Sequence, residues 1–569
     1  MRPHSKFWPL RLPTSITTPE TTLVFNLDVT AARYPNKDAI RFFGANLTYA
    51  ELKRQADAVA GWLQRVANVA PGDRVLLYLQ NSPQHVIATY AILRAQCVVV
   101  PVNPMNRAEE LRHYISDAGA RVVICAADLA GIVAQASAEV GADDRVRHLL
   151  VTRYADAMPP SGSIDPEEAP PAAWTAWLEG DPPLPAGATR WTDAISSAHK
   201  PMPAQGGPDD LAVMPYTSGT TGFPKGCMHT HRTIMHNVIG GALMGNAGAD
   251  ATVLAVVPLF HVTGMLYGMH TPIFGGATVV MMPRWDRELA GRLISRHRVT
   301  HWTNIPTMII DMFGSPNIEK FDLSSLRNLS GGGAAMPHAV AERLQKQFGI
   351  TYAEGYGLTE TAAPSHSNPP ERAKLQCLGM PIYGTDARVV DPDTLQELAP
   401  NQVGEIIING PQVFKGYWRN PAATEAAFID FEGKKFFRTG DLGRMDEEGY
   451  FFLTDRLKRM INASGFKVWP AEVESLLYKH PAIQEACIIA SHDAYRGETV
   501  KAVVVLRADA KGRTSSEEII GWAREHMAAY KVPRIVEFVD ELPKSGTGKV
   551  MWRTLQEREA AREQAAAKQ

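Results

Sequence analysis

Helical and strand-like patterns alternate along the first part of the chain. In residues 47–64, LTYAELKRQADAVAGWLQ, apolar side chains recur at the spacing of one helix face. Apolar runs of strand length follow at residues 75–79, VLLYL, and 97–102, CVVVPV. Continuous apolar strands separated by amphipathic helices favour a layered α/β domain with parallel strands, because such strands are buried on both faces.

A proline-rich stretch interrupts this alternation. Eleven of the 40 prolines lie between residues 159 and 208, and we expect an irregular surface segment there, because proline lacks an N–H donor and disfavours helices and central strands. The α/β pattern resumes at residue 211, with strand-like runs such as ATVLAVVPLF (251–260) and GATVVMM (276–282). From residue 404 onward, short β runs separated by glycine turns replace it.

The chain is too long for a single hydrophobic core, so more than one domain is expected. The pattern predicts an α/β protein with a large N-terminal domain, residues 1–455, of layered α/β subdomains plus a β-rich part. Residues 456–569 are expected to form a small α+β domain. Its predicted elements are a helix in AEVESLLY, strands in ACIIAS and VKAVVVL, a helix in SSEEIIGWAREHM and a strand in RIVEFV.

Composition and charge exclude several classes of protein. A hydrophobic content of 45% and a charged content of 21% are typical of a soluble globular protein, and the formal charge of −2 gives no electrostatic case for nucleic acid. The five cysteines are scattered without CxxC spacing, which indicates buried thiols in a reducing compartment. With no secretory signal or spanning segment in the sequence, we expect a cytoplasmic protein without an integral membrane segment. The sequence is compatible with peripheral contact to a membrane and with a homodimer, and it decides neither.

Two polar loops are candidates for phosphate binding. The first, YTSGTTGFPKG (216–226), combines glycines that let backbone N–H groups approach an anion with hydroxyl donors and one lysine. It is not a Walker A loop, because Pro224 precedes Lys225. The second, PKSGTGKV (543–550), has proline in place of the first Walker glycine and valine in place of the hydroxyl residue. By composition alone, the first loop is an even choice between a plain turn and a phosphate-binding segment.

Four further motifs lie between these loops in a fixed order, namely SGGGAAMP (330–337), EGYGLTE (354–360), RTGDLG (438–443) and DRLKRMINASGFKVWPAEVE (455–474). Singly, each has a plain structural explanation, such as a turn-forming aspartate or a packed loop tyrosine. As an ordered set, they resemble the adenylate-forming superfamily of acyl-CoA synthetases, luciferases and peptide-synthetase adenylation domains. The resemblance extends from about residue 25 to the PKSGTGK segment.

The resemblance implies a site for ATP and Mg²⁺. Tyr356 would stack on adenine, Asp441 would accept the ribose hydroxyls, and Thr217 and Glu360 would hold Mg²⁺, which prefers oxygen ligands. The implied catalytic residues are Lys549, Glu360, Thr217, His261 and Lys225. The residues implied to bind ATP or AMP are Thr217, Ser218, Gly219, Thr220, Thr221, Gly222, Lys225, Gly332, Gly333, Ala334, Glu354, Gly355, Tyr356, Gly357, Leu358, Thr359, Asp441, Arg456 and Lys549.

The resemblance also implies two reactions at one site. A carboxylic acid and ATP would give an acyl-adenylate and pyrophosphate, and the thiol of coenzyme A would then displace AMP. The small domain would be mobile and would present Lys549 in the first step and the loop with Gly465, which lines a tunnel for CoA, in the second. Lys458 would be the hinge. Some relatives, notably luciferases, have a lysine where this chain has Asn462, and its absence weakens a luciferase-type interpretation.

The identity of the acid is less constrained. The implied acyl pocket consists of Phe260, His261, Met265, Tyr267, Trp302, Thr303, Ile305, Met308 and Gly357. No carboxylate lies in residues 261–265, which argues against an amino acid substrate, and glycine at 357 stands where acetate-activating relatives have tryptophan. We expect a medium- or long-chain fatty acid; an aryl or methylthio acid also fits. A luciferase-like or carrier-loading enzyme, and a nucleotide-binding protein such as a P-loop kinase, are the alternatives from other classes.

If Lys549 neutralises charge between the carboxylate and the α-phosphate, Lys549→Ala should abolish formation of the acyl-adenylate. Formation of thioester from supplied acyl-adenylate should be largely spared, because that step does not need this lysine. Pyrophosphate release and thioester formation, measured separately, check both statements. Equal losses in the two steps would contradict the assignment.

Overall fold

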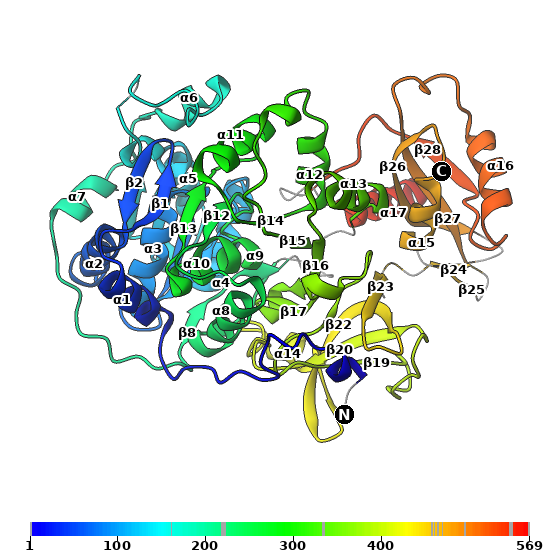
Figure 1. Cartoon of the computed structure of the whole chain (residues 1–569), viewed down its shortest axis with the longest axis horizontal. Coiled ribbons are helices and arrows are strands. Elements are labelled where there is room, and N and C mark those ends of the chain that lie inside the picture. Colours follow the sequence, from blue (N-terminus) through cyan, green and yellow to red (C-terminus); the bar gives the residue numbers. More distant parts are fainter. Residues whose placement is uncertain are drawn as a thin grey trace. The chain divides into compact units, whose positions relative to one another are not determined.

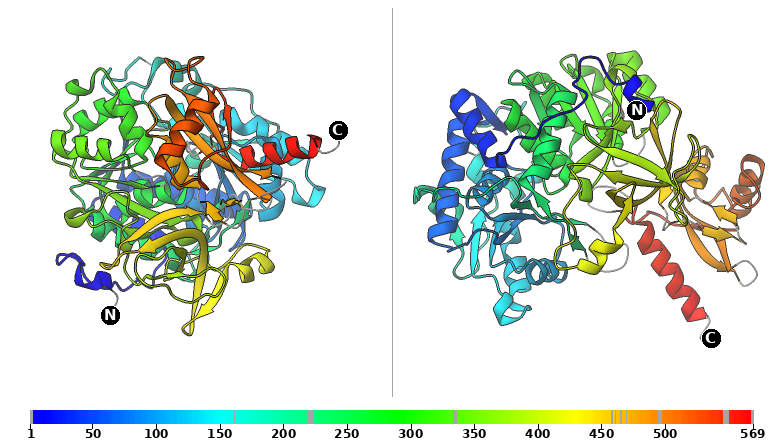
Figure 2. Two further views of the ribbon diagram at one scale, coloured as in Figure 1. Left: turned by 90° about the vertical axis from the view of Figure 1, so that its right-hand side faces the viewer. Right: turned by 90° about the horizontal axis from the view of Figure 1, so that it is seen from below.

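The computed structural model describes residues 3–160, 162–217, 224–332, 336–456, 459, 461–463, 466–468, 470–493, 497–544 and 550–566. The chain forms two compact units. The first comprises Met1–Asp386, Ile408–Phe437 and Glu448–Tyr450, and the second comprises Ala387–Ile407, Arg438–Glu447 and Phe451–Gln569. The expected boundary between residues 455 and 456 stays a prediction. Figure 1 labels the elements, and Figure 2 gives two further views.

A seven-stranded sheet in the first unit has the order β11-β8-β4-β3-β5-β6-β7. All its pairings are parallel except that of β8 with β11. Every residue of β4 and β5 is buried, as expected for strands covered by helices on both faces. The strands are β3 (Arg74–Tyr78), β4 (Val98–Pro101), β5 (Val122–Ala126), β6 (His148–Thr152), β7 (Thr189–Arg190), β8 (Leu211–Val213) and β11 (His229–Thr230).

A nine-stranded sheet in the same unit has the order β18-β17-β16-β15-β14-β12-β13-β1-β2. The strands from β16 to β1 pair in parallel, and antiparallel strands close both edges. The strands are β1 (Asp38–Phe42), β2 (Ala45–Thr48), β12 (Thr252–Ala255), β13 (Thr278–Met281), β14 (His301–Asn304), β15 (Asn328–Gly332), β16 (Tyr352–Leu358), β17 (Ala363–Ser367) and β18 (Met380–Pro381).

Helices pack against these two sheets and share one hydrophobic core with them, except α14, which packs against a separate cluster that contains Phe414 and Phe437. The helix expected in residues 47–64 is present as α2, and Thr48 caps it by accepting a hydrogen bond from the Glu51 N–H. The helices are α1 (Leu23–Arg33), α2 (Tyr49–Arg65), α3 (Pro83–Arg94), α4 (Ala108–Ala118), α5 (Ala130–Ala138), α6 (Ala172–Leu178), α7 (Trp191–Ser196), α8 (His231–Gly245), α9 (Val262–Met265), α10 (Thr271–Gly275), α11 (Arg287–His297), α12 (Pro306–Phe313), α13 (His338–Phe348) and α14 (Pro421–Ala426).

Short elements and buried cysteines complete the first unit. The proline-rich stretch is largely irregular, as expected, although α6, β7 and α7 lie within it. Cys97, Cys125, Cys227 and Cys377, together with Cys487 of the second unit, are buried, and none of these five described cysteines forms a disulfide. No helix in the described part of the chain is long and apolar enough to cross a membrane.

A five-stranded sheet has the order β19-β20-β22-β21, with β23 also beside β22. Its strands are the short β runs with glycine turns that the sequence predicts after residue 404, preceded by one further strand. They are β19 (Asp386–Val390), β20 (Gly404–Asn409), β21 (Phe428–Phe431), β22 (Lys434–Met445) and β23 (Phe451–Arg456).

The C-terminal part of the second unit is an α+β fold, as predicted. Its sheet has the order β25-β24-β27-β26, and β28 pairs with β27. The expected helices and strands are all present, and Figure 2 shows α17 as one straight helix. The elements are β24 (Ile461–Ala463), β25 (Phe466–Val468), α15 (Pro470–Leu477), β26 (Ile483–Asp493), β27 (Gly497–Leu506), α16 (Ser516–His526), β28 (Ile535–Phe538) and α17 (Trp552–Ala566).

Candidate active site

The ends of the first polar loop lie side by side. Thr217 on β9 (Tyr216–Thr217) pairs with Lys225 on β10 (Lys225–Gly226) in antiparallel register. The two residues that flank the loop therefore face each other in this short antiparallel ladder. The predicted phosphate-binding residues between them, Ser218, Gly219, Thr220, Thr221 and Gly222, lie outside the described residues.

Helix α4 fixes both flanks of this loop. The Tyr216 hydroxyl donates to Asp117 Oδ2 over 2.5 Å, and His113 Nε2 lies 2.7 Å from the carbonyl oxygen of Pro224. Burial, followed by the neighbouring Asp117, raises the pKa of Tyr216, so its hydroxyl keeps its proton and remains a donor. Both described flanks of the loop are therefore anchored to the same helix.

Tyr417, which the sequence did not single out, contacts both the lysine expected to bind phosphate and the carboxylate expected to bind Mg²⁺. The Nζ atom of Lys225 lies 4.3 Å from the ring centroid of Tyr417, a cation–π contact. The Tyr417 hydroxyl donates to Glu360 Oε1 over 2.9 Å, and both side chains are buried. Burial and the adjacent Glu360 carboxylate raise the pKa of Tyr417, which keeps the hydroxyl a donor. Lys225, Tyr417 and Glu360 thus form one polar group.

Side chains of α8 and β11 hold the turn that carries Thr359 and Glu360. His229 Nε2 donates to the Thr359 carbonyl over 2.7 Å, and the Asn237 amide donates to three carbonyls of residues 361–364. Burial lowers the pKa of His229 to about 4, so the ring is neutral and serves as a structural donor. The turn follows β16, on which the predicted adenine-stacking Tyr356 is also buried.

Glu354 holds two loops beside the predicted adenine slot. Its carboxylate accepts hydrogen bonds from the Gln376 N–H over 2.8 Å and the Met336 N–H over 3.4 Å. Burial raises the pKa of Glu354 to about 7, and the two backbone hydrogen bonds offset this only in part. Gly333 and Ala334 of the same predicted slot lie outside the described residues.

Strand pairing gives a structural reason for glycine at two positions where the resemblance implies contact with a ligand. A Cβ atom on Gly332 would lie 2.4 Å from the Gly355 carbonyl oxygen of the neighbouring strand. On Gly357, a Cβ would lie 1.6 Å from the Ala363 carbonyl oxygen, beside a β-bulge between β16 and β17. Any side chain at these positions would force the strands apart. That Gly357 keeps an acyl tunnel open stays a prediction.

The predicted pocket pair Phe260 and His261 lies directly before α9, with His261 as its N-cap and the two ring centroids 4.7 Å apart. Asn81, which the sequence did not single out, fixes the segment before them. Its amide donates to the Val257 carbonyl over 3.1 Å and accepts from the Leu259 N–H over 2.8 Å. Asn81 follows β3 of the seven-stranded sheet, and residues 257–259 follow β12 of the nine-stranded sheet. The buried Asn81 side chain therefore links the two sheets directly before Phe260 and His261.

The other predicted pocket residues are mostly buried and apolar. Met265 and Met308 are buried, whereas Tyr267 is partly exposed. Trp302 is 1% exposed and stacks on Trp285 at 5.6 Å. Thr303 and Ile305 follow Trp302 along β14 and the start of α12, and both are half-buried.

The predicted nucleotide and hinge residues of the second unit are described only in part. Asp441 on β22 is buried and stands opposite Arg456 of β23 in the strand register. The Thr439 hydroxyl accepts from the Asp441 N–H and donates to the Ile406 carbonyl, which fixes the turn before it. The Arg456 side chain and residues Lys458, Gly465 and Lys549 lie outside the described part.

Comparisons with known proteins identify the family. The model described as AMP-binding enzyme matches residues 27–418, and the model described as AMP-binding enzyme C-terminal domain matches residues 472–549. The chain belongs to the AMP-binding enzyme family. This match confirms the resemblance to adenylate-forming enzymes that the ordered motifs indicated.

Individual relatives cover nearly the whole chain. It is 37% identical to a long-chain-fatty-acid–CoA ligase of Bacillus subtilis over 98% of both chains. It is 34% identical to a feruloyl-CoA synthase of Amycolatopsis sp., over 91% of this chain and 95% of that one. A crystal structure of ATP-bound MatB from Rhodopseudomonas palustris superposes with a TM-score of 0.81 at 29% identity, over 95% of this chain and 99% of the other. The predicted α/β fold class is confirmed.

The raised pKa of Glu354 predicts a pH-dependent stability. Its folded value of about 7 lies above the ordinary value of 4.5, so its contribution is complete below the ordinary value and is lost as pH rises through about 7. Glu354→Gln has no such titration. Relative to this variant, the wild type should lose on the order of 2 kcal/mol of unfolding free energy between about pH 5 and about pH 8.

Urea unfolding of both proteins across this pH range measures the difference. Glu319→Gln, at an exposed position of the same unit, is the matched control and should follow the wild type at every pH. If the curves of wild type and Glu354→Gln run parallel, the carboxyl group does not titrate in this range.

Proposed function

We propose that this protein is an AMP-forming acid–CoA ligase. It converts a carboxylic acid and ATP to an acyl-adenylate and pyrophosphate, and then transfers the acyl group to the thiol of CoA with release of AMP. The observation that supports this best is the contact of Lys225 with Tyr417 and of Tyr417 with Glu360, beside Thr217, in a chain that belongs to the AMP-binding enzyme family. The Bacillus and Amycolatopsis relatives are named for different acids but share CoA as the acceptor.

The charges of this group suit a polyphosphate and a hard cation. Lys225 supplies a cation at the end of the loop, where it would neutralise phosphate oxygens. Glu360 and Thr217 offer a carboxylate and a hydroxyl oxygen, the ligand types that Mg²⁺ prefers. Bound there, Mg²⁺ would offset charge on the phosphates as the carboxylate attacks in line. Tyr417 orients the Glu360 carboxylate for this role.

We favour a medium- or long-chain fatty acid as the substrate. The buried Met265, Met308 and Trp302 would offer apolar walls, and methionine adapts to irregular shapes. An aryl acid is the second candidate, because the feruloyl-CoA synthase relative covers almost the entire chain. The cytoplasmic location and the hinge at Lys458 stay predictions.

A pyrophosphate-release screen with and without CoA tests the function. The acids range from acetate to stearate and include ferulate and a methylthio acid. We expect AMP, pyrophosphate and a CoA thioester with the preferred acid. ADP as the product would indicate a kinase, and AMP without a thioester would indicate a luciferase-like or carrier-loading enzyme; either result would contradict the proposal.

Tyr417→Phe tests the role of the tyrosine. The variant keeps the ring beside Lys225 but removes the hydroxyl that donates to Glu360. Loss of one such hydrogen bond, worth about 1 kcal/mol, should raise the Mg²⁺ concentration for half-maximal adenylation about fivefold. Titration of Mg²⁺ at saturating ATP and acid measures this value. Tyr417→Leu, which also removes the ring, should weaken ATP binding as well, whereas an unchanged Mg²⁺ requirement in Tyr417→Phe would contradict the assigned role.

A further inference from the structure

A buried asparagine on α8 faces the turn that follows Glu360. The Asn237 side chain is 0% exposed, and its amide nitrogen lies 2.8 to 3.1 Å from the carbonyl oxygens of Thr361, Ala362 and Pro364. Three carbonyl oxygens at this position require the NH₂ group of the amide, because only a donor can satisfy them. Every hydrogen bond that the described residues make with this side chain is therefore donated to the turn.

The turn that Asn237 contacts has an unfavourable backbone conformation. Ala362 ends the short helical turn Thr359–Thr361 with φ 50° and ψ 50°, and Ala363 follows with φ 77°. At such positive φ a Cβ atom crowds the backbone, so alanine adopts this conformation at a cost in free energy that the surroundings must offset. The hydrogen bonds from Asn237 reach carbonyl groups before, within and after this pair of alanines.

The same turn determines where the Glu360 carboxylate lies. Glu360 is the middle residue of the helical turn, and the Thr361 hydroxyl closes that turn by accepting from the Leu358 N–H over 2.9 Å. The Glu360 carboxylate accepts from the Tyr417 hydroxyl over 2.9 Å. A backbone that relaxed to negative φ after Thr361 would change the direction of the turn, and the carboxylate would no longer face the tyrosine.

Helix α8 holds Asn237 in a fixed position. The preceding residue, His236, lies 2.8 Å from the Tyr383 carbonyl oxygen through Nε2 and 3.0 Å from Thr18 Oγ1 through Nδ1. Burial lowers the pKa of His236, so the ring is neutral, donates to the carbonyl and accepts from the threonine hydroxyl. An amide on a helix that is packed in this way is a rigid support for the turn, as precise positioning of a ligand requires.

We propose that Asn237 is a positioning residue that holds the Glu360 carboxylate in the geometry needed for Mg²⁺. The proposal rests on the proposed function, because it assigns Glu360 to the metal. Asn237 contacts neither metal nor substrate in this role. It acts by stabilising the strained backbone at Ala362 and Ala363, which follows Glu360 directly in the turn.

Asn237→Ala tests the proposal, and Ala362→Gly tests how the asparagine acts. Asn237→Ala should raise the Mg²⁺ concentration for half-maximal, acid-dependent pyrophosphate release about tenfold, because the buried carbonyl groups lose their donor and the turn relaxes. Glycine adopts positive φ without strain, so adding Ala362→Gly to Asn237→Ala should lower this concentration again by about threefold. In the wild type, Ala362→Gly should change it less than about twofold.

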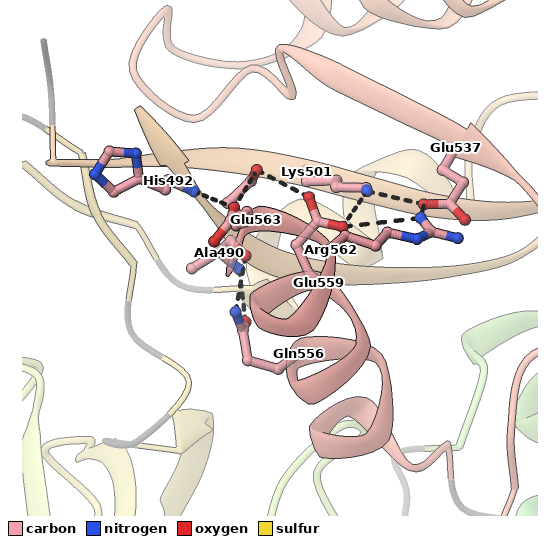
Figure 3. A network of polar contacts seen from close by, with 9 residues as sticks. Ala490, His492, Lys501, Glu537, Gln556, Glu559, Arg562 and Glu563 are labelled. Atoms are coloured by element: carbon pink, nitrogen blue, oxygen red, sulfur yellow. Dashed lines mark hydrogen bonds and ion pairs between the residues drawn. The ribbon is translucent and has the colours of Figure 1, made fainter. Parts of the chain in front are cut away.

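A control variant removes a comparable amide from another part of the chain. Gln556 of α17 accepts from the Ala490 N–H over 2.9 Å and donates to the Ala490 carbonyl over 2.8 Å (Figure 3). Gln556→Ala therefore also removes side-chain hydrogen bonds to the backbone, but these bonds join α17 to β26 in the second unit. It should leave the Mg²⁺ requirement unchanged.

Two further measurements do not depend on turnover. Calorimetric titration with ATP in the absence of acid should show binding about tenfold weaker in Asn237→Ala than in the wild type when Mg²⁺ is present, and a change of less than about twofold in EDTA. Urea unfolding in EDTA should show that Ala362→Gly stabilises Asn237→Ala more than it stabilises the wild type. If Asn237→Ala does not fold, Asn237→Ser, which keeps one donor, should give smaller changes in the same directions.

Three outcomes would overturn the proposal. They are an unchanged Mg²⁺ requirement in Asn237→Ala, an equal rise in Gln556→Ala, and a rise that Ala362→Gly does not reduce. Weakening of ATP binding to the same extent with Mg²⁺ and in EDTA would also overturn it, because the asparagine would then support the fold without acting on the metal. A wild-type protein that forms no acyl-adenylate with any acid would instead overturn the proposed function, and the calorimetric and unfolding measurements would still test Asn237.

Discussion

The hydrogen bond from Tyr417 to Glu360 joins the segments on which the candidate site depends. Backbone pairing supports it, because the Phe414 N–H donates to the Glu360 carbonyl and the Trp418 N–H donates to the Gly226 carbonyl. Residues 414–418 therefore lie between the strand that begins at Lys225 and the turn that carries Glu360. Displacing this one segment would separate the lysine from the carboxylate, although neither belongs to it.

Two buried glutamates of the first unit have different surroundings and different roles. Glu360 receives a tyrosine hydroxyl next to a lysine, whereas Glu354 receives two backbone N–H groups and has a pKa of about 7. A carboxyl group near neutrality is poorly suited to holding a cation at constant affinity, but it is well suited to joining two loops. The environment, more than the residue type, separates the structural carboxyl group from the candidate metal ligand.

The periodicity of the sequence predicted the α/β class, helix α2 and the elements of the C-terminal α+β fold, because these depend on local spacing. The ordered motifs predicted the family. Tyr417 and Asn81 were missed because their partners lie 57 and 178 positions away, and no local pattern records such contacts. Gly357 was predicted as open pocket space, but the structure supplies a second reason for glycine there, the close approach of the Ala363 carbonyl.

The position of Lys225 is fixed by contacts with three other segments. Its backbone pairs with Thr217, its Nζ atom lies 4.3 Å from the ring centroid of Tyr417, and the carbonyl oxygen of the preceding residue, Pro224, lies 2.7 Å from His113 Nε2 of α4. A side chain that is already ordered loses less conformational entropy when it binds a ligand, so contacts of this kind favour binding without touching the ligand themselves. Tyr417 and His113 thus support the candidate site through the placement of Lys225.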